Sequence, residues 1–246
     1  MPGTWQQETI AGHAADIYTP PGVTRPAYAL LFLHAVGQET LIGCDAFTRV
    51  FDDLGVPCVS PHGKFTWWSD RIDITYDPAI SAETYLLQQL VPHMRQRFGL
   101  PERRIGLFGI SMGGQGALRL AFKHPQVFSA VAGISPAIEY HELHGQGYTL
   151  DAMYESKEHC RQDTVPMHIH PSEYPPHIFF CIDPDDADWH RGNDRLHEKL
   201  RALGVLHECD LTTEAGGHSW QYFNHMAERA IRFVYEGLVA QSRRLL

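Results

Sequence analysis

The chain has 246 residues, of which 43% are hydrophobic and 20% charged, and its formal net charge is −9. This length suffices to bury a large core, and an acidic balance without a basic run argues against nucleic acid or an anionic membrane as the main partner. No window approaches 18 consecutive apolar residues, and no apolar stretch follows a basic one at the N-terminus. Neither a membrane span nor a secretory signal is therefore expected.

Apolar runs separated by glycine and proline predict the elements of the first half. A helix over 46–54 should end at Gly55, and a long amphipathic helix should run from Ser81 to Phe98, kinked or broken by Pro92. The other predicted elements are a hairpin or edge strand at 5–20, strands at 28–34, 56–61 and 104–108, and a loop at 62–77.

The second half continues this alternation of helices and strands. The predicted helices span 115–122, 193–203 and 220–239, and the predicted strands span 127–134, 177–182 and 206–212. Residues 136–176 lack periodicity and are interpreted as a lid or insertion over the site. The alternation predicts an α/β fold, with a mostly parallel central sheet and helices on both faces, in one domain covering 1–246.

The sequence Gly109-Ile110-Ser111-Met112-Gly113 lies between a predicted strand and a predicted helix. That context is typical of a nucleophile elbow, a turn so tight that only glycines on either side leave room for the strand and helix to approach. Ser111 is therefore the predicted nucleophile. The backbone N–H of Met112, the next residue, should stabilise the oxyanion that forms during acyl transfer.

A serine nucleophile needs a base and an orienting carboxylate, which in this fold follow it in the order acid, then histidine. His218, in a glycine-rich loop after the last predicted strand, is the predicted base. The acid should be Asp188, with Asp186 as second choice, because Asp183 lies too close to the strand end to reach the histidine. A second oxyanion donor should be the N–H of Val36 or of Ala35.

The chain has five cysteines and no C-x-x-C pair. Cys58, Cys181 and Cys209 lie in or beside predicted strands, so we expect them to be buried free thiols and the protein to be cytoplasmic. Sixteen histidines are many for this length, and several crowd 141–177 together with Cys160. Their spacing matches no standard metal motif, so we expect neither a metal nor another cofactor.

Several motifs spread over about 30–220 resemble the esterase D branch of the α/β-hydrolases. They are G-x-S-M-G-G-x-G-A-L around the elbow, Trp67-Trp68-Ser69-Asp70, the helix from Glu83 to Pro92, Lys123-His124-Pro125, Asp188-Trp189 and Gly217-His218-Ser219-Trp220. That branch includes S-formylglutathione hydrolases, feruloyl and acetylxylan esterases, and mycolyltransferases. The chain departs from it at Ala35, where the family usually has glycine, so the choice between Ala35 and Val36 stays open.

These features together predict a serine carboxylic-ester hydrolase that forms an acyl-enzyme on a small-molecule ester or thioester. Trp67, Trp68 and Trp189 could line its substrate pocket, and Arg191 could hold a substrate carboxylate. The alternatives are acyl transfer to a sugar or another alcohol, and a non-catalytic α/β-hydrolase that serves as a binding module.

Overall fold

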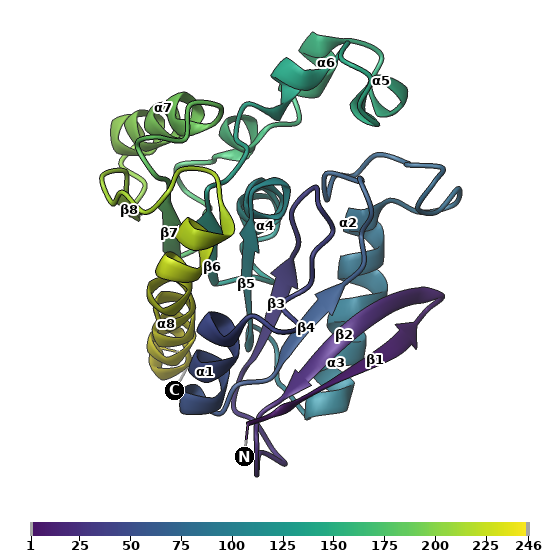
Figure 1. Ribbon diagram of the computed structural model, residues 1–246, viewed down its shortest axis with the longest axis vertical. Helices are drawn as coiled ribbons and strands as arrows, with labels where there is room; N and C mark the ends of the chain where they lie inside the picture. Colours follow the sequence, from purple (N-terminus) through teal and green to yellow (C-terminus); the bar gives the residue numbers. More distant parts are fainter. Residues whose placement is uncertain (1, 245–246) are drawn as a thin grey trace.

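The computed structural model describes residues 2–244, which build an eight-stranded sheet with helices on both faces (Figure 1). The strand order is β1-β2-β4-β3-β5-β6-β7-β8. The strands are β1 (Thr4–Ile10), β2 (His13–Thr19), β3 (Ala29–Leu33), β4 (Cys58–Pro61), β5 (Ile105–Ile110), β6 (Ala130–Ile134), β7 (His177–Cys181) and β8 (Glu208–Asp210). The hairpin β1–β2 joins β4 antiparallel, and the strands from β4 to β8 run parallel.

The central strands are buried on both faces, as parallel strands covered by helices must be. Every residue of β3, β5 and β6 is buried. Their pairing joins distant parts of the chain, since Ala29 lies opposite Ile105 and Leu33 lies opposite Gly109. The predicted α/β class and mostly parallel sheet are confirmed.

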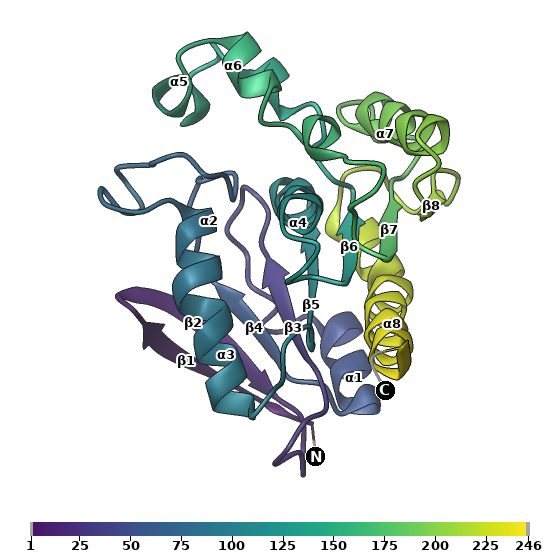
Figure 2. The ribbon, with the colours of Figure 1, turned by 180° about the vertical axis from the view of Figure 1, so that it is seen from behind.

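Two apolar cores fill the space between the sheet and its helices. One lies under α1 (Asp45–Leu54) and α8 (Trp220–Arg244), which face the viewer in Figure 1. The other lies under α3 (Val91–Phe98), α4 (Met112–Lys123) and α7 (His190–Ala202), on the face that Figure 2 shows. Four short helices cross above the carboxyl ends of the parallel strands: η2 (Tyr140–Leu143), α5 (Leu150–Met153), α6 (Lys157–Arg161) and η3 (Val165–His168).

The predicted helix from Ser81 to Phe98 is present, and its internal proline is accommodated by a wider turn. Ser81 caps the first turn, α2 (Ala82–Tyr85), by accepting a hydrogen bond from the Thr84 N–H. A π-helical turn, η1 (Leu86–Leu90), follows before α3, and the Val91 N–H donates to the carbonyl of Leu86, five residues earlier. Because proline lacks an N–H and crowds the preceding turn, this local widening replaces the predicted kink or break.

Several predicted boundaries are wrong by a few residues. Helix α7 begins at His190 rather than 193, β8 covers only Glu208–Asp210, and α8 continues to Arg244. By contrast, Gly55 ends α1 with a φ of 60°, as predicted. Within the described residues, no helix has both the length and the apolar character that crossing a membrane requires.

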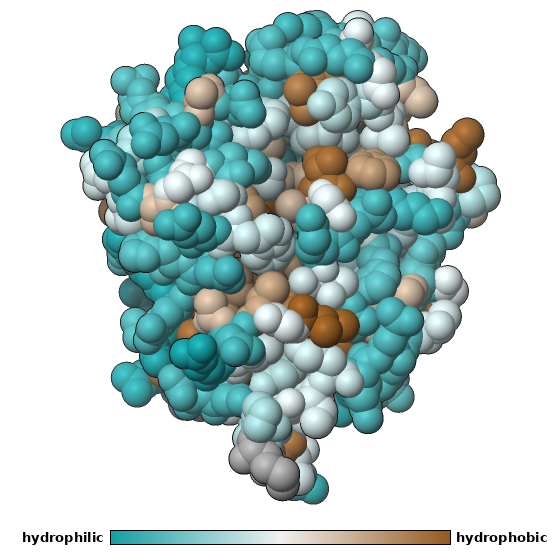
Figure 3. Space-filling model, in the orientation of Figure 1, coloured by the Kyte–Doolittle hydropathy of each residue, from teal (hydrophilic) through white to brown (hydrophobic). Residues whose placement is uncertain are grey.

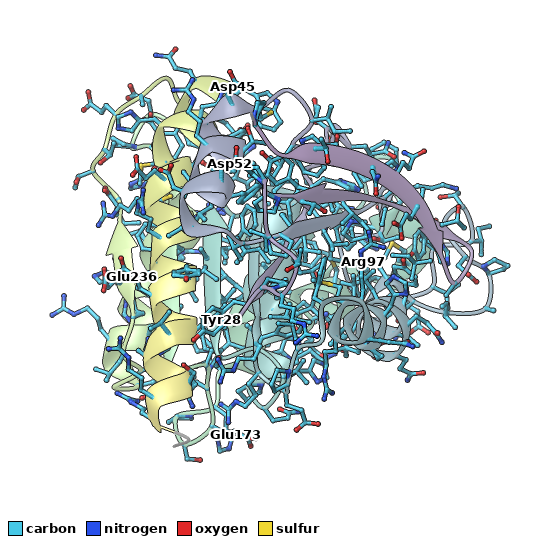
Figure 4. All side chains as sticks on the ribbon, turned by 90° about the horizontal axis from the view of Figure 1, so that it is seen from below. Tyr28, Asp45, Asp52, Arg97, Glu173 and Glu236 are labelled. Carbon is cyan, nitrogen blue, oxygen red and sulfur yellow. The ribbon has the colours of Figure 1, made fainter. Side chains whose placement is uncertain are left out.

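The surface on the side of α1 and α8 is mostly hydrophilic, with small separate apolar patches (Figure 3). Exposed large apolar side chains such as Ile74 and Leu206 are few. Figure 4 shows the opposite end of the sheet from the short helices, where Tyr28 lies beside α8. The hydroxyl of Tyr28 shares a hydrogen bond of 2.8 Å with Ser242 Oγ, which anchors the last turns of α8 to the sheet.

Candidate active site

Ser111 occupies the single-residue turn between β5 and α4, with φ 54° and ψ −114°. A non-glycine residue with positive φ is strained, and an elbow of this kind holds its serine in that way. Glycine is required on both sides of the turn. An added Cβ at Gly113 would lie 1.9 Å from the carbonyl oxygen of Leu33, and one at Gly109 would lie 2.2 Å from that of Gly113.

His218 lies directly against this serine. Its Nε2 is 2.9 Å from Ser111 Oγ. The loop that carries the ring is held by the buried carboxylate of Asp183, which accepts hydrogen bonds from the N–H groups of Ala215 and Gly217 at 2.6 and 2.9 Å. The structure thus brings together the two residues predicted as nucleophile and base, and it gives Asp183 a supporting role in the loop.

Asp186, rather than Asp188, orients the ring of His218. The distance from Asp186 Oδ2 to His218 Nδ1 is 2.6 Å, and the aspartate side chain is fully buried. The choice of Asp188 is therefore corrected. After β7 the chain forms a turn in which the Asp186 N–H donates to the carbonyl of Asp183. This turn directs Asp186 inward, and leaves Asp188 exposed at the edge of the cavity.

His34 fixes the peptide group that precedes Val36. The Gly63 N–H can only donate to His34 Nε2, at 2.9 Å, so the ring proton is on Nδ1 and is donated to the Ala35 carbonyl at 2.7 Å. Burial lowers the pKa of His34 to about 4, which keeps the ring neutral. Because the N–H and C=O of a trans peptide point in opposite directions, this contact turns the Val36 N–H away from His34.

A cavity of about 600 Å³ opens above Ser111 and His218. Trp67 and Trp189 line it, together with residues of the segment after β6 such as Leu143 and Tyr148. Trp67 stacks on Tyr140, with ring centroids 5.2 Å apart. Sequence analysis predicts that the segment after β6 covers the site, but not which of its residues line the cavity, because the segment has no hydrophobic periodicity.

Trp68 does not line the cavity, contrary to the prediction. It is fully buried, and its Nε1 donates to the carbonyl of His34 at 3.1 Å. The two neighbouring tryptophans thus have different surroundings, although both have a φ of 53°. Arg191 does border the cavity, but its guanidinium donates to Glu139 at 2.8 Å.

A buried ionic cluster fixes the elbow helix to the segment above the site. Arg119 of α4 has no exposed surface, and it pairs with Glu83 and Asp163 at 2.5 Å each. Burial opposes ionisation of Glu83, but hydrogen bonding from His124 and the charges of Arg119 and Lys123 outweigh it and lower the pKa of Glu83 to about 2. Asp163 also accepts a hydrogen bond from Tyr154 at 2.7 Å.

Comparison with solved structures finds the same architecture in several serine hydrolases. The Staphylococcus aureus fluorophosphonate-binding serine hydrolase FphF, in its substrate-bound form, superposes with a TM-score of 0.77, at 16% identity over 95% of this chain and 99% of that one. An S-formylglutathione hydrolase from Agrobacterium tumefaciens gives 0.78, at 15% identity over 96% and 94%. A ferulic acid esterase gives 0.76, at 17% identity over 96% and 98%.

The architecture is thus that of the α/β-hydrolases. Residues 75–232, more than half of the chain, match the model of the Esterase family. The chain therefore belongs to the Esterase family and is a serine esterase, which confirms the predicted resemblance to the esterase D branch. Among curated proteins, no sequence matches it significantly.

Proposed function

We propose that Ser111, His218 and Asp186 form the catalytic triad of a hydrolase that acts on small carboxylic esters or thioesters. The main support is the unbroken chain of hydrogen bonds from Ser111 Oγ through His218 to the buried carboxylate, with distances of 2.9 and 2.6 Å. In such a chain the ring accepts the serine proton, while the carboxylate holds the correct tautomer and stabilises the imidazolium that forms.

The reaction proceeds in two acyl transfers. Ser111 Oγ attacks the carbonyl carbon as its proton passes to His218 Nε2, and the carbonyl electrons move onto oxygen. Collapse of this tetrahedral intermediate expels the alcohol or thiol, which takes the proton from His218 and leaves an acyl-enzyme. Water, deprotonated by the same ring, then attacks the acyl group, and Ser111 leaves with the proton.

The developing oxyanion is stabilised by the N–H groups of Met112 and Val36. Met112 is the first residue of α4, where helix N–H groups are free to bind an anion. Val36 borders the same cavity as Ser111, and the His34 contact with the Ala35 carbonyl orients its N–H. We favour Val36 over Ala35 for this reason, and we assign His34 a positioning role.

Replacing His34 by leucine should therefore lower kcat about 10- to 100-fold, less than loss of an oxyanion donor itself would. The Ala35 carbonyl then keeps only its hydrogen bond from the Gln38 N–H, at 3.0 Å, so the peptide is held less firmly. Substrate binding is unaffected, so KM should stay near the wild-type value. His34→Asn is the matched control, because its amide can donate from near the position of Nδ1. Steady-state kinetics with a p-nitrophenyl ester checks this, and equal losses in both variants would refute the positioning role.

The cavity suits a small acyl group with one flat apolar side. Trp67 and Trp189 offer an aromatic wall, while Glu142 and Gln146 make the rim polar. A polar rim could also bind a sugar or another alcohol as the acceptor, so acyl transfer to such an alcohol is the second candidate reaction. Product analysis with such an alcohol present separates the two reactions, since transfer requires the alcohol to outcompete water at the acyl-enzyme.

Labelling with a fluorophosphonate tests the proposed nucleophile. We expect the folded protein to be modified once, at Ser111, and the Ser111→Ala variant and the denatured protein not at all. Ser135→Ala is the matched control, because Ser135 is also buried and also has a positive φ, 45°, yet its Oγ makes no hydrogen bond within the described residues. If folded protein stays unmodified at Ser111 in the mass spectrum, the assignment of Ser111 as the nucleophile is refuted.

A further inference from the structure

We propose that His197, His207 and Cys209 bind a zinc ion where α7 meets the edge of the sheet. His197 lies on α7, His207 precedes β8 and Cys209 lies within β8. One ligand atom from each lies within 4.8 Å of the other two, and this is the only such group of metal-binding side chains among residues 2–244. Helix α7 and strand β8 lie side by side in Figures 1 and 2, apart from the elbow.

The distances within this cluster are close to those of zinc ligands. His197 Nδ1 lies 2.8 Å from His207 Nε2 and 3.2 Å from Cys209 Sγ. Two nitrogen ligands of a tetrahedral zinc lie about 3.3 Å apart and a nitrogen and a sulfur about 3.5 Å, given the usual bond lengths. The ion therefore fits after these side chains move apart by a few tenths of an ångström.

The ring of His207 is already held in the orientation that a ligand needs. Its Nδ1–H donates to the carbonyl of Val205 at 2.9 Å, so the lone pair of Nε2 points into the cluster. Metal-bound histidines usually have such a partner on the second ring nitrogen. The ring also stacks on Phe180, with the centroids 5.8 Å apart.

Without an ion, the three side chains cannot all form hydrogen bonds with one another. If His197 Nδ1 donates its proton to His207 Nε2, it cannot accept one from the Cys209 thiol. With a zinc ion bound, each of the three side chains instead forms one bond to the metal. It displaces the thiol proton, which leaves as H⁺, and the thiolate and two neutral imidazoles occupy three tetrahedral positions while water takes the fourth.

The site should stabilise the edge of the sheet rather than take part in ester hydrolysis. It would join α7 to β8, the strand before the loop that carries His218. Sequence analysis predicted no metal because this spacing matches no standard motif: His207 and Cys209 are only two residues apart, and His197 lies ten residues before His207 on a helix. The inference does not depend on the proposed triad.

Metal binding can be measured on protein stripped with a chelator under reducing conditions. We expect one equivalent of Zn²⁺ to bind and to raise the melting temperature, and one equivalent of Co²⁺ to give a thiolate-to-cobalt charge-transfer band. Cys209→Ser should abolish that band, and His197→Gln should weaken zinc binding at least tenfold. Cys44→Ser is the matched control, because Cys44 is also a partly exposed thiol.

The cobalt band makes the experiment decisive in a chain with sixteen histidines, which can bind metal weakly elsewhere. No band in the wild-type protein, or a band that survives in Cys209→Ser, would overturn the proposal. So would a band that is lost in Cys44→Ser. If Cys209→Ser does not fold, His197→Gln decides, since unchanged zinc affinity in that variant is equally incompatible with the site.

Discussion

Replacing Asp186 by asparagine is expected to lower kcat about 10⁴-fold, as the equivalent change does in the best-studied triad. Asparagine has the same shape, but it can present an N–H to His218 Nδ1. The ring then carries its proton on Nε2, where it cannot accept the proton of Ser111. The buried position of the carboxylate, 2.6 Å from the ring, makes this change of tautomer hard to avoid.

Asp188→Asn is the matched control for this experiment. Asp188 borders the cavity but is exposed, so the kcat of the Asp188→Asn variant should stay near that of the wild type. Steady-state kinetics on a p-nitrophenyl ester compares the two variants, and melting temperatures verify that both are folded. A larger loss for Asp188→Asn than for Asp186→Asn would return the role of the acid to Asp188.

Replacing Arg119 by methionine should lower the free energy of unfolding by about 3–5 kcal/mol. Methionine roughly fills the space but leaves the carboxylates of Glu83 and Asp163 buried without their main counter-charge. Arg191→Met is the matched control, because that arginine pairs with Glu139 while 61% of its side chain is exposed. Exposed pairs contribute about 0–1 kcal/mol, so the control should lose little in urea-induced unfolding.

Acidification separates the charge effect from a packing effect. The pKa of Glu83 is about 2 in the folded protein and its ordinary value is 4.5, so the ionised form stabilises the wild type above pH 4.5. That contribution is lost as the pH falls towards 2. The stability difference between the wild type and Arg119→Met should therefore shrink over this range, and a difference independent of pH would attribute the loss to packing alone.

Ser111 and His218 could be predicted from the sequence because Ser111 lies between two glycines, His218 follows two glycines, and both have fixed places in the order of strands. The elbow permits no other residue at Gly113, where a Cβ would collide with the backbone of β3. The acid was harder to place, since Asp183, Asp185, Asp186 and Asp188 follow one strand. Which of them reaches His218 depends on the turn closed by the Asp186 N–H and the Asp183 carbonyl, and no periodicity encodes that turn.

The other missed features arise from contacts between distant segments. Trp67 and Trp68 are adjacent and alike, yet Trp67 lines the cavity while Trp68 is buried and donates to the carbonyl of His34. Arg119 looks like one more polar residue on a helix, yet it is fully buried because Glu83 and Asp163 approach from either side. Neither the surroundings of the tryptophans nor the ion pairs of Arg119 can be recognised from the neighbouring residues in the sequence.

The register between β3 and β5 has a consequence for how the molecule acquires its activity. Ala29 pairs with Ile105, so closing this part of the sheet brings together segments that are far apart along the chain. Such long-range pairing costs loop entropy and tends to be slow. The elbow depends on it, because Gly113 fits against the end of β3. A nascent or partly refolded chain should thus stay inactive until its central strands have paired, even when the segments on either side of the elbow are already helical or extended.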